Sequence, residues 1–138
     1  MKTLAFAVAL TLLTAIPASA DTTHYQFRNR TGGCLLNDNG PATTGTCNTS
    51  STRWTLSDGS NGAYRINANG FSLTDNADGT VTVSPTGADG QDWSFKHAGP
   101  YTLVTTSDLR HLSAHTDGSV GAEYHTGNTE LWVLDEVN

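Results

Sequence analysis

Three stretches, Trp54-Thr55-Leu56, Trp93-Ser94-Phe95 and Trp132-Val133-Leu134, contain every tryptophan of the chain, and the interval between successive tryptophans is the same. A pair of residues typical of tight turns precedes each tryptophan, again at one constant interval: Asn39-Gly40, Asp78-Gly79 and Asp117-Gly118. Tryptophan is rare, so its recurrence with a turn pair at one spacing is not expected by chance. The sequence therefore predicts three internal repeats of about 39 residues.

Two further positions support the repeat. An apolar residue stands six residues before each turn glycine: Cys34, Leu73 and Leu112. Each copy also opens with a tyrosine, and the third of these tyrosines is displaced by two residues: Tyr25, Tyr64 and Tyr101. We therefore expect one register, without a gap, from Cys34 to Leu56 and through the two later copies of that segment.

The residue pattern within each copy is that of short strands. Residues two apart share one face of a strand, and two such apolar pairs recur. One pair is the tryptophan with the apolar residue two positions later, and the other pair opens each copy: Tyr25/Phe27, Tyr64/Ile66 and Tyr101/Leu103. No stretch after residue 20 has the apolar spacing of a helix. The sequence predicts twelve strands, four per copy: 24–29, 33–37, 42–47 and 53–57; 63–67, 71–75, 80–84 and 92–96; 100–105, 110–114, 119–124 and 130–135.

A single four-stranded copy cannot bury its own apolar face. Three copies arranged about an axis can, and closing the sheet removes the open edges that favour aggregation. The predicted fold is all-β, a threefold barrel capped by hairpins. An ordinary two-sheet sandwich is the alternative, but a sandwich gives no reason for a period of this kind.

Residues 1–20 have the pattern of a signal peptide. Lys2 is followed by a mostly apolar run from Leu4 to Ile16, and Ala18-Ser19-Ala20 is an A-x-A cleavage pattern. An uncleaved membrane anchor is the alternative. We expect residues 1–20 to be a signal peptide, residues 21–138 to be one domain, and the protein to be secreted.

Composition excludes several functions for residues 21–138. Residues 21–138 contain thirteen acidic and six basic side chains, which gives a net charge of −7. This negative charge argues against binding nucleic acid. No apolar run after residue 20 is long enough to span a membrane. In an oxidising compartment, Cys34 and Cys47, the two cysteines of the chain, are expected to form a disulfide.

These residues resemble a known family. Three copies of this length, each ending in a tryptophan strand, look like a β-trefoil, and within that fold the chain looks most like the ricin B-type lectin domains. The matching segments are 25–30, Gly33-Cys34-Leu35 and Gln91-Asp92-Trp93, which fits the Q-x-W motif of the family. Thr52-Arg53-Trp54 and Glu130-Leu131-Trp132 are degenerate versions of that motif. The resemblance covers residues 24–137 and implies carbohydrate binding without catalysis.

The sugar-binding positions of such lectins are not retained. The aspartate that follows the Cys-Leu motif falls at Leu36, Thr74 and Ser113. The asparagine before Q-x-W falls at Ser51, Gly90 and Thr129. The stacking aromatic falls at Ala42, Val81 and Val120. The scaffold thus matches the family better than its known sugar site does.

Other polar and aromatic residues are candidates for a sugar site, because carboxylates and amides bind paired hydroxyls and an aromatic face covers the apolar side of a sugar ring. Tyr124 and His125 have no aromatic counterparts in the other copies, so the shared core does not require them. Asp75 lies one residue past the family's aspartate position, which puts it on the other face of a strand unless a bulge intervenes. The candidates for carbohydrate binding are Asn37, Asp38, Asp75, Asn76, Asp89, Gln91, Tyr124, His125 and Asn128.

Catalysis, metal binding and cofactors receive no comparable support. The chain has no G-x-S-x-G or H-E-x-x-H motif. His111, His115 and His125 form a conceivable but weak zinc set. We therefore expect a secreted, non-enzymatic protein without a cofactor or metal, whose partners are glycans. The alternatives are a protein-binding module, as in toxin accessory subunits with trefoil domains, and a secreted hydrolase inhibitor, as in Kunitz-type trefoils.

Overall fold

The computed structural model describes residues 22–137, so the predicted signal peptide lies outside the described residues. This part of the chain contains thirteen strands and two single turns of 3₁₀ helix, and it has no helix long and apolar enough to cross a membrane. The strands are β1 (His24–Asn29), β2 (Cys34–Leu35), β3 (Gly40–Pro41), β4 (Thr44–Gly45), β5 (Thr55–Asp58), β6 (Tyr64–Ala68), β7 (Phe71–Asp75), β8 (Val81–Pro85), β9 (Ser94–Ala98), β10 (Tyr101–Thr105), β11 (His111–Ala114), β12 (Val120–Glu123) and β13 (Trp132–Val137); the 3₁₀ turns are η2 (Ser50–Thr52) and η3 (Asn128–Glu130).

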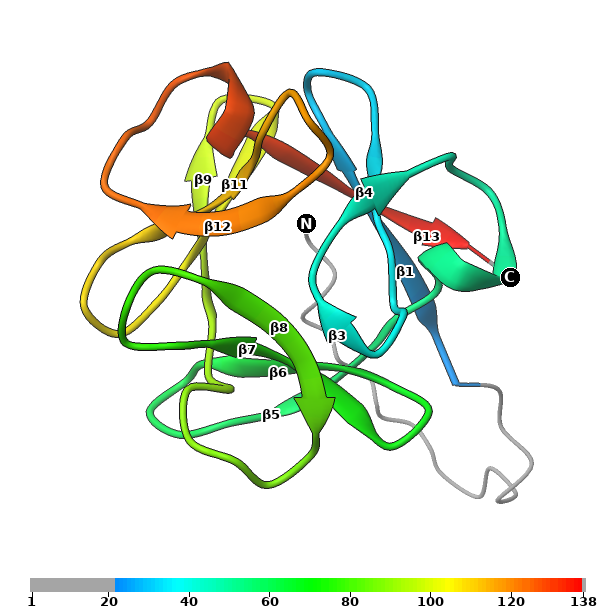
Figure 1. Ribbon diagram of the computed structural model, residues 1–138, viewed down its shortest axis with the longest axis vertical. Coiled ribbons are helices and arrows are strands. Elements are labelled where there is room, and N and C mark those ends of the chain that lie inside the picture. Colours follow the sequence, from blue (N-terminus) through cyan, green and yellow to red (C-terminus); the bar gives the residue numbers. More distant parts are fainter. Residues whose placement is uncertain (1–21, 138) are drawn as a thin grey trace.

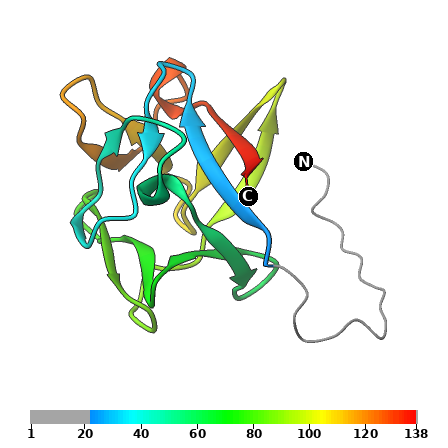
Figure 2. The ribbon, with the colours of Figure 1, turned by 90° about the vertical axis from the view of Figure 1, so that its right-hand side faces the viewer.

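Six strands form a closed barrel. Antiparallel ladders join β1 to β13, β5 to β6 and β9 to β10. Three further backbone pairings join these ladders into a ring: Tyr25 with Trp54, Tyr64 with Trp93, and Thr102 with Trp132. The first and last described strands lie side by side, as Figure 2 shows. Closure through β1 and β13 leaves the barrel without an exposed edge.

Three hairpins complete the fold, one from each repeat. They are β2 with β4, β7 with β8, and β11 with β12. Figure 1 shows them arranged around the centre of the molecule. Their tips pair with one another through Gly40 and Val83, Thr43 and Ser119, and Thr80 and Gly121. The predicted threefold all-β architecture is confirmed.

The three tryptophans occupy equivalent core positions. Trp54, Trp93 and Trp132 are each fully buried. The indole Nε1–H of each donates to a leucine carbonyl in the first strand of its hairpin: Leu35 at 3.1 Å, Leu73 at 2.9 Å and Leu112 at 2.9 Å. Burial of a large ring with its one polar atom satisfied is strongly stabilising. The period in the sequence therefore marks one packing unit used three times.

The prediction of a register without gaps is wrong in the first repeat. The structural counterpart of Leu73 and Leu112 is Leu35, not Cys34, because Leu35 accepts the indole hydrogen bond. The first copy is therefore one residue shorter between this leucine and the turn glycine Gly40. Its hairpin is also split, and β3 and β4 replace the single strand expected at 42–47.

The inward-facing pair predicted for the third repeat is also wrong. Thr102 pairs with Trp132 as Tyr25 pairs with Trp54, so the third copy is offset by one residue. Thr102 and Val104 are buried, whereas Tyr101 and Leu103 are only partly buried. Since strand faces alternate with a period of two, an offset of one residue exchanges the inner and outer side chains.

The predicted disulfide is confirmed. Cys34 in β2 is bonded to Cys47 in the loop that follows β4, and their Cα atoms lie 5.1 Å apart. The bond ties a two-residue strand to an irregular loop in the repeat with the least regular hairpin. It therefore supports the part of the fold where backbone pairing contributes least.

Candidate functional site

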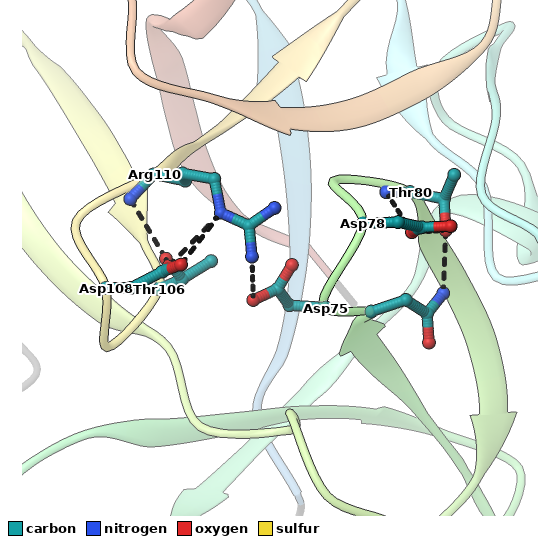
Figure 3. Close-up of polar contacts among 7 residues, drawn as sticks. Asp75, Asp78, Thr80, Thr106, Asp108 and Arg110 are labelled. Atoms are coloured by element: carbon teal, nitrogen blue, oxygen red, sulfur yellow. Dashed lines mark hydrogen bonds and ion pairs between the residues drawn. The ribbon is translucent and has the colours of Figure 1, made fainter.

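A buried arginine lies among three aspartates at the junction of the second and third repeats (Figure 3). Arg110 is 7% exposed and immediately precedes β11. Its Nη2 lies 3.2 Å from Oδ2 of Asp75, at the end of β7, and its Nε lies 3.0 Å from Oδ2 of Asp108. Asp78, in the turn after β7, is within electrostatic range of the same guanidinium. The cluster thus joins two repeats through one positive and three negative groups.

Local hydrogen bonds hold the acidic side of this cluster. The N–H of Asp75 donates to the carbonyl of Gly90 at 2.8 Å, which ties the end of β7 to the loop before Trp93. The side chain of Asn76 donates to the Thr80 hydroxyl at 3.1 Å. Oδ1 of Asp78 accepts the N–H and the hydroxyl of Thr80, at 3.0 and 2.7 Å. Asp78 is therefore a turn-forming residue, as Asp-Gly pairs usually are.

The three carboxylates experience different environments. Burial raises the pKa of Asp75, and the attraction of Arg110 offsets this only in part. One of its oxygens, Oδ1, is buried without a hydrogen-bond partner among the described residues. Hydrogen bonds from Thr80 lower the pKa of Asp78, and hydrogen bonds from Thr106 and Arg110 lower that of Asp108. The two exposed aspartates are therefore ionised at neutral pH.

An exposed aromatic ring lies beside this cluster. Tyr124 is 68% exposed and follows β12 directly. The pairing of His111 with Glu123 places Tyr124 opposite Arg110 across the third hairpin, and the phenol is close enough to affect the pKa of Arg110. His125 and Asn128 are exposed on the same loop, and Asn128 begins η3. The structure thus brings Asp75, Tyr124 and the guanidinium of Arg110 to one junction.

Gln91 has a structural position. Its side chain is 2% exposed; Oε1 accepts the N–H of Gly87 at 2.9 Å, and Nε2 donates to Thr74 and to the Pro85 carbonyl, both at 3.0 Å. These contacts hold the loop between β8 and Trp93. A ligand could reach Gln91 only if this loop opened.

The other two repeats hold the same loop with different residues. In the third repeat, Glu130 accepts from the N–H of Gly127 at 2.8 Å and from Ser113 at 2.6 Å. In the first repeat, Thr52 stands at the equivalent position, and its side chain is too short to make this bond. Gln26 reaches in from β1 instead, and accepts the N–H of Asn48 at 2.7 Å. The loop bond is thus made from within the loop in the second and third repeats and from β1 in the first.

The remaining predicted residues lie elsewhere. The side-chain amide of Asn37 donates to the carbonyls of Ser50 and Arg53, at 3.2 and 2.9 Å, in the first repeat. Asp38 is exposed in the same repeat, and Asp89 is exposed in the loop that Gln91 closes. The structure therefore gathers only part of the predicted set at one place.

The three histidines of the third repeat do not form a metal site, and residues 22–137 contain no group of three side chains suited to hold a metal ion. Nδ1 of His111 bonds to the Thr105 hydroxyl at 2.9 Å, and burial lowers the pKa of this histidine. His115 contacts Ser119 and Glu123. Ser119 donates its hydroxyl hydrogen to Asp117 at 2.7 Å, a bond within the Asp117-Gly118 turn.

Arg110, the central residue of the junction, is not among the residues predicted for the site. Arg110 occupies in the third repeat the position that Phe71 has in the second, and Phe71 packs against the core, so a cation replaces an apolar residue in the repeat pattern. This departure from the period was the available signal. The sequence could not show that the guanidinium turns towards Asp75, because that contact crosses between repeats.

The fold has many counterparts among solved structures. SeviL, solved bound to asialo-GM1 saccharide, matches with a TM-score of 0.72 and 18% identity over 86% of this chain and 100% of its own. The designed threefold-symmetric protein ThreeFoil matches with a TM-score of 0.68 and 20% identity over 83% of this chain and 99% of its own. An endo-β-galactosidase from Clostridium perfringens matches with a TM-score of 0.72 and 22% identity over 84% of this chain and 33% of its own.

These similarities define the fold of the protein. The chain has the β-trefoil fold, as its resemblance to the ricin B-type lectin domains predicted, and its structural neighbours include a protein solved with a bound saccharide and a glycosidase of which the match covers a third. At identities below a quarter, the similarity shows the fold alone. No protein-family model and no curated protein sequence matches the chain.

Proposed function

We propose that the protein is a secreted, non-catalytic, carbohydrate-binding β-trefoil protein. In this proposal residues 1–20 are the signal peptide and residues 21–138 the trefoil domain. The leading segment and the disulfide between Cys34 and Cys47 support secretion, since such bonds persist in oxidising compartments. The match over the whole length of SeviL, solved with a bound saccharide, supports a binding function rather than catalysis.

The observation that carries the proposal is the exposure of Tyr124 at the junction of the second and third repeats. The ring is close enough to Arg110 to affect its pKa, and the ionised Asp78 and Asp108 lie around the same guanidinium, an arrangement that suits a neutral sugar. The ring covers the apolar face of the sugar, and carboxylate oxygens accept hydrogen bonds from its hydroxyls. Asp75 contributes indirectly, by holding Arg110 and so fixing the position of the loop that carries Asp108.

A glycan array tests this proposal. The wild-type protein, Tyr124→Ala and Asp75→Ala are applied at equal concentration, and Asp58→Ala serves as the control for loss of an exposed acid outside the junction. We expect Tyr124→Ala to abolish binding, Asp75→Ala to weaken it, and Asp58→Ala to leave it unchanged. Binding to no glycan by the wild-type protein would overturn the proposal. Dispersed amide NMR spectra of all variants exclude unfolding as the cause.

Protein binding is a second candidate, favoured by Leu109. This side chain is 58% exposed, and its φ of 71° is a left-handed conformation that a leucine rarely adopts. Strained, exposed apolar residues are frequent at recognition sites. A Leu109→Ala variant that keeps glycan binding but loses a co-purifying protein would support this function. Glycan binding that depends on Leu109 would instead assign the residue to the sugar site.

A further inference from the structure

One end of the barrel lies away from the three hairpins that complete the fold. Strands β1, β6 and β10 each lead into a hairpin at their carboxyl ends, so their amino ends point away from the hairpins. Directly paired residues of an antiparallel ladder lie on one face, as do residues two apart along a strand. The strand registers therefore place six side chains on the inner face at this rim, which we call the barrel mouth: Tyr25, Asp58, Tyr64, His97, Thr102 and Glu136.

The layer beneath the barrel mouth is apolar. It is formed by the side chains two positions further into the barrel: Phe27, Leu56, Ile66, Phe95, Val104 and Leu134. Three of these are fully buried, and the other three, Leu56, Phe95 and Leu134, are only partly buried although they face inward. Solvent therefore reaches an apolar floor through the mouth. The mouths of β-barrels are frequent sites for small ligands.

Aromatic rings form part of the wall of the mouth. The rings of Tyr64 and Phe95 are stacked, with their centroids 5.1 Å apart and an angle of 12° between their planes. Burial raises the pKa of the Tyr25 phenol, and Glu136 and Tyr64 raise it further, so both lie within electrostatic range of Tyr25. In the third repeat, Thr102 stands where the other two have these tyrosines. The shorter side chain leaves the ring of phenols open on one side.

The charge of the mouth favours a cation. Asp58 and Glu136 are both exposed there, and the six side chains of the mouth include no lysine or arginine. Two carboxylates at the rim attract a positive charge, and the faces of tyrosine rings do so through their quadrupole. A strongly hydrated cation gains nothing from an apolar floor. A quaternary ammonium group suits both parts, because it has a full positive charge and an apolar surface of methyl groups.

We propose that the barrel mouth binds a quaternary ammonium group, such as the trimethylammonium of choline, against the rings of Tyr25 and Tyr64, with Glu136 as its counter-ion. The methyl groups contact the apolar floor at Leu134 and Phe95. The mouth shares no residue with the cluster around Arg110 or with Tyr124. The proposal therefore stands or falls separately from the sugar surface at Tyr124.

The test is a titration of the ¹⁵N-labelled protein with choline chloride, followed by amide NMR spectra. The neutral alcohol 3,3-dimethylbutan-1-ol has the same shape with a carbon in place of the nitrogen, and ammonium chloride reports general attraction of cations to an acidic protein. We expect saturable shifts at Tyr25, Tyr64 and Glu136 with choline, and binding of the neutral alcohol weaker by about tenfold. Shifts of equal size with either control compound, or none with choline, would overturn the proposal.

Variants assign the effect to the mouth. Tyr64→Leu should weaken choline binding by about tenfold, whereas Tyr64→Phe, which keeps the ring, should retain it. Glu136→Gln should weaken it about fivefold and keeps the test valid if Tyr64→Leu does not fold, since Glu136 is exposed. Asp135→Asn is the matched control, because Asp135 is the preceding residue, faces outward and pairs with Arg28. Equal losses in Glu136→Gln and Asp135→Asn, or unchanged affinity in Tyr64→Leu, would contradict the proposal.

Vesicles distinguish a lipid source of the quaternary ammonium group from a soluble one. Sedimentation of the protein with phosphatidylcholine vesicles, but not with phosphatidylglycerol vesicles, would assign the lipid headgroup as the ligand. Choline binding without sedimentation would assign a soluble ligand. Both results uphold the proposal, and Tyr124→Ala should leave choline binding unchanged.

Discussion

The guanidinium of Arg110 lies 3.2 Å from the carboxylate of Asp75, and this contact joins the third repeat to the second. Side-chain exposure is 9% for the arginine and 14% for the aspartate, so little water screens the pair. Burial nevertheless raises the pKa of Asp75, which means that the carboxylate loses more by leaving water than the arginine returns. The pair therefore serves the geometry of the junction more than the stability of the fold.

Removal of Arg110 should lower the free energy of unfolding, because the pair is buried. Arg110→Gln leaves the buried carboxylate of Asp75 without its cation, and we expect a loss of about 3 kcal/mol in the free energy of unfolding. The double variant Asp75→Asn/Arg110→Gln should recover much of the loss, because both charges are gone. Urea denaturation at neutral pH measures both. Additive losses in the double variant would show that the two residues do not interact.

Gly90 should tolerate no side chain. A Cβ at this position would lie 2.2 Å from the carbonyl oxygen of Asp75, and the φ of Gly90 is 81°. We expect Gly90→Ala to cost well over the roughly 1 kcal/mol of an unfavourable φ alone. Gly99→Ala is the matched control, since Gly99 has a φ of 64° and no atom within 4 Å of an added Cβ. Equal melting temperatures for the two variants would refute the predicted clash.

Gln91 should prove structural rather than ligand-binding. Gln91→Ala removes the acceptor of the Gly87 N–H and the amide group that donates to Thr74 and to the Pro85 carbonyl. We expect a loss of about 2 kcal/mol in the free energy of unfolding. Glu130→Gln places the same residue in the third repeat, where the bond to the N–H of Gly127 is retained, and should cost less. Thermal denaturation compares the two. Glycan binding that disappears in a fully folded Gln91→Ala protein would instead assign Gln91 to the site.

The disulfide between Cys34 and Cys47 should contribute measurably to stability. It closes a short loop, for which chain-entropy arguments give about 3 kcal/mol. The double variant Cys34→Ala/Cys47→Ala should unfold at lower urea concentration than the wild-type protein. Treatment of the wild-type protein with a reductant should produce the same shift. A midpoint that does not move on reduction would show that the bond adds nothing to the native state.

The turn at Asp117 predicts a pH dependence. Hydrogen bonds from the hydroxyl and N–H of Ser119 lower the pKa of Asp117 from its ordinary value of 3.8. Because the folded-state pKa is lower than the unfolded one, this contribution is complete above about pH 4 and is lost as the pH falls further. The difference in unfolding free energy between wild type and Asp117→Ala should therefore shrink in acid. A difference that stays constant from neutral pH to about pH 2 would contradict this origin.

The buried Asp75 provides the control for this pH dependence, because its trend has the opposite sign. Its folded-state pKa is raised, so the ionised form is disfavoured in the native protein, and protonation adds stability as the pH falls through that value. Asp75→Asn should thus remove a contribution of opposite sign to that of Asp117→Ala. Urea denaturation of the wild-type protein and of the two variants from neutral to acid pH separates the two effects.

The sequence alone determined the repeat, the all-β class and the three tryptophans of the core. A tryptophan at a fixed spacing needs a buried site in every copy, and no single copy provides one, so closure about an axis follows from burial. The disulfide was also predictable, because two cysteines have one way to pair. These features depend on residue type and spacing, which the sequence states directly.

The tertiary structure alone decided the register and the junctions. Offsets of one residue near Leu35 and Thr102 change which side chains face inward, and backbone pairing across the barrel sets them. The contact of Arg110 with Asp75 arises between repeats. Such contacts depend on how closed strands meet in space. A period along the chain carries no information about which side chains of different repeats come into contact.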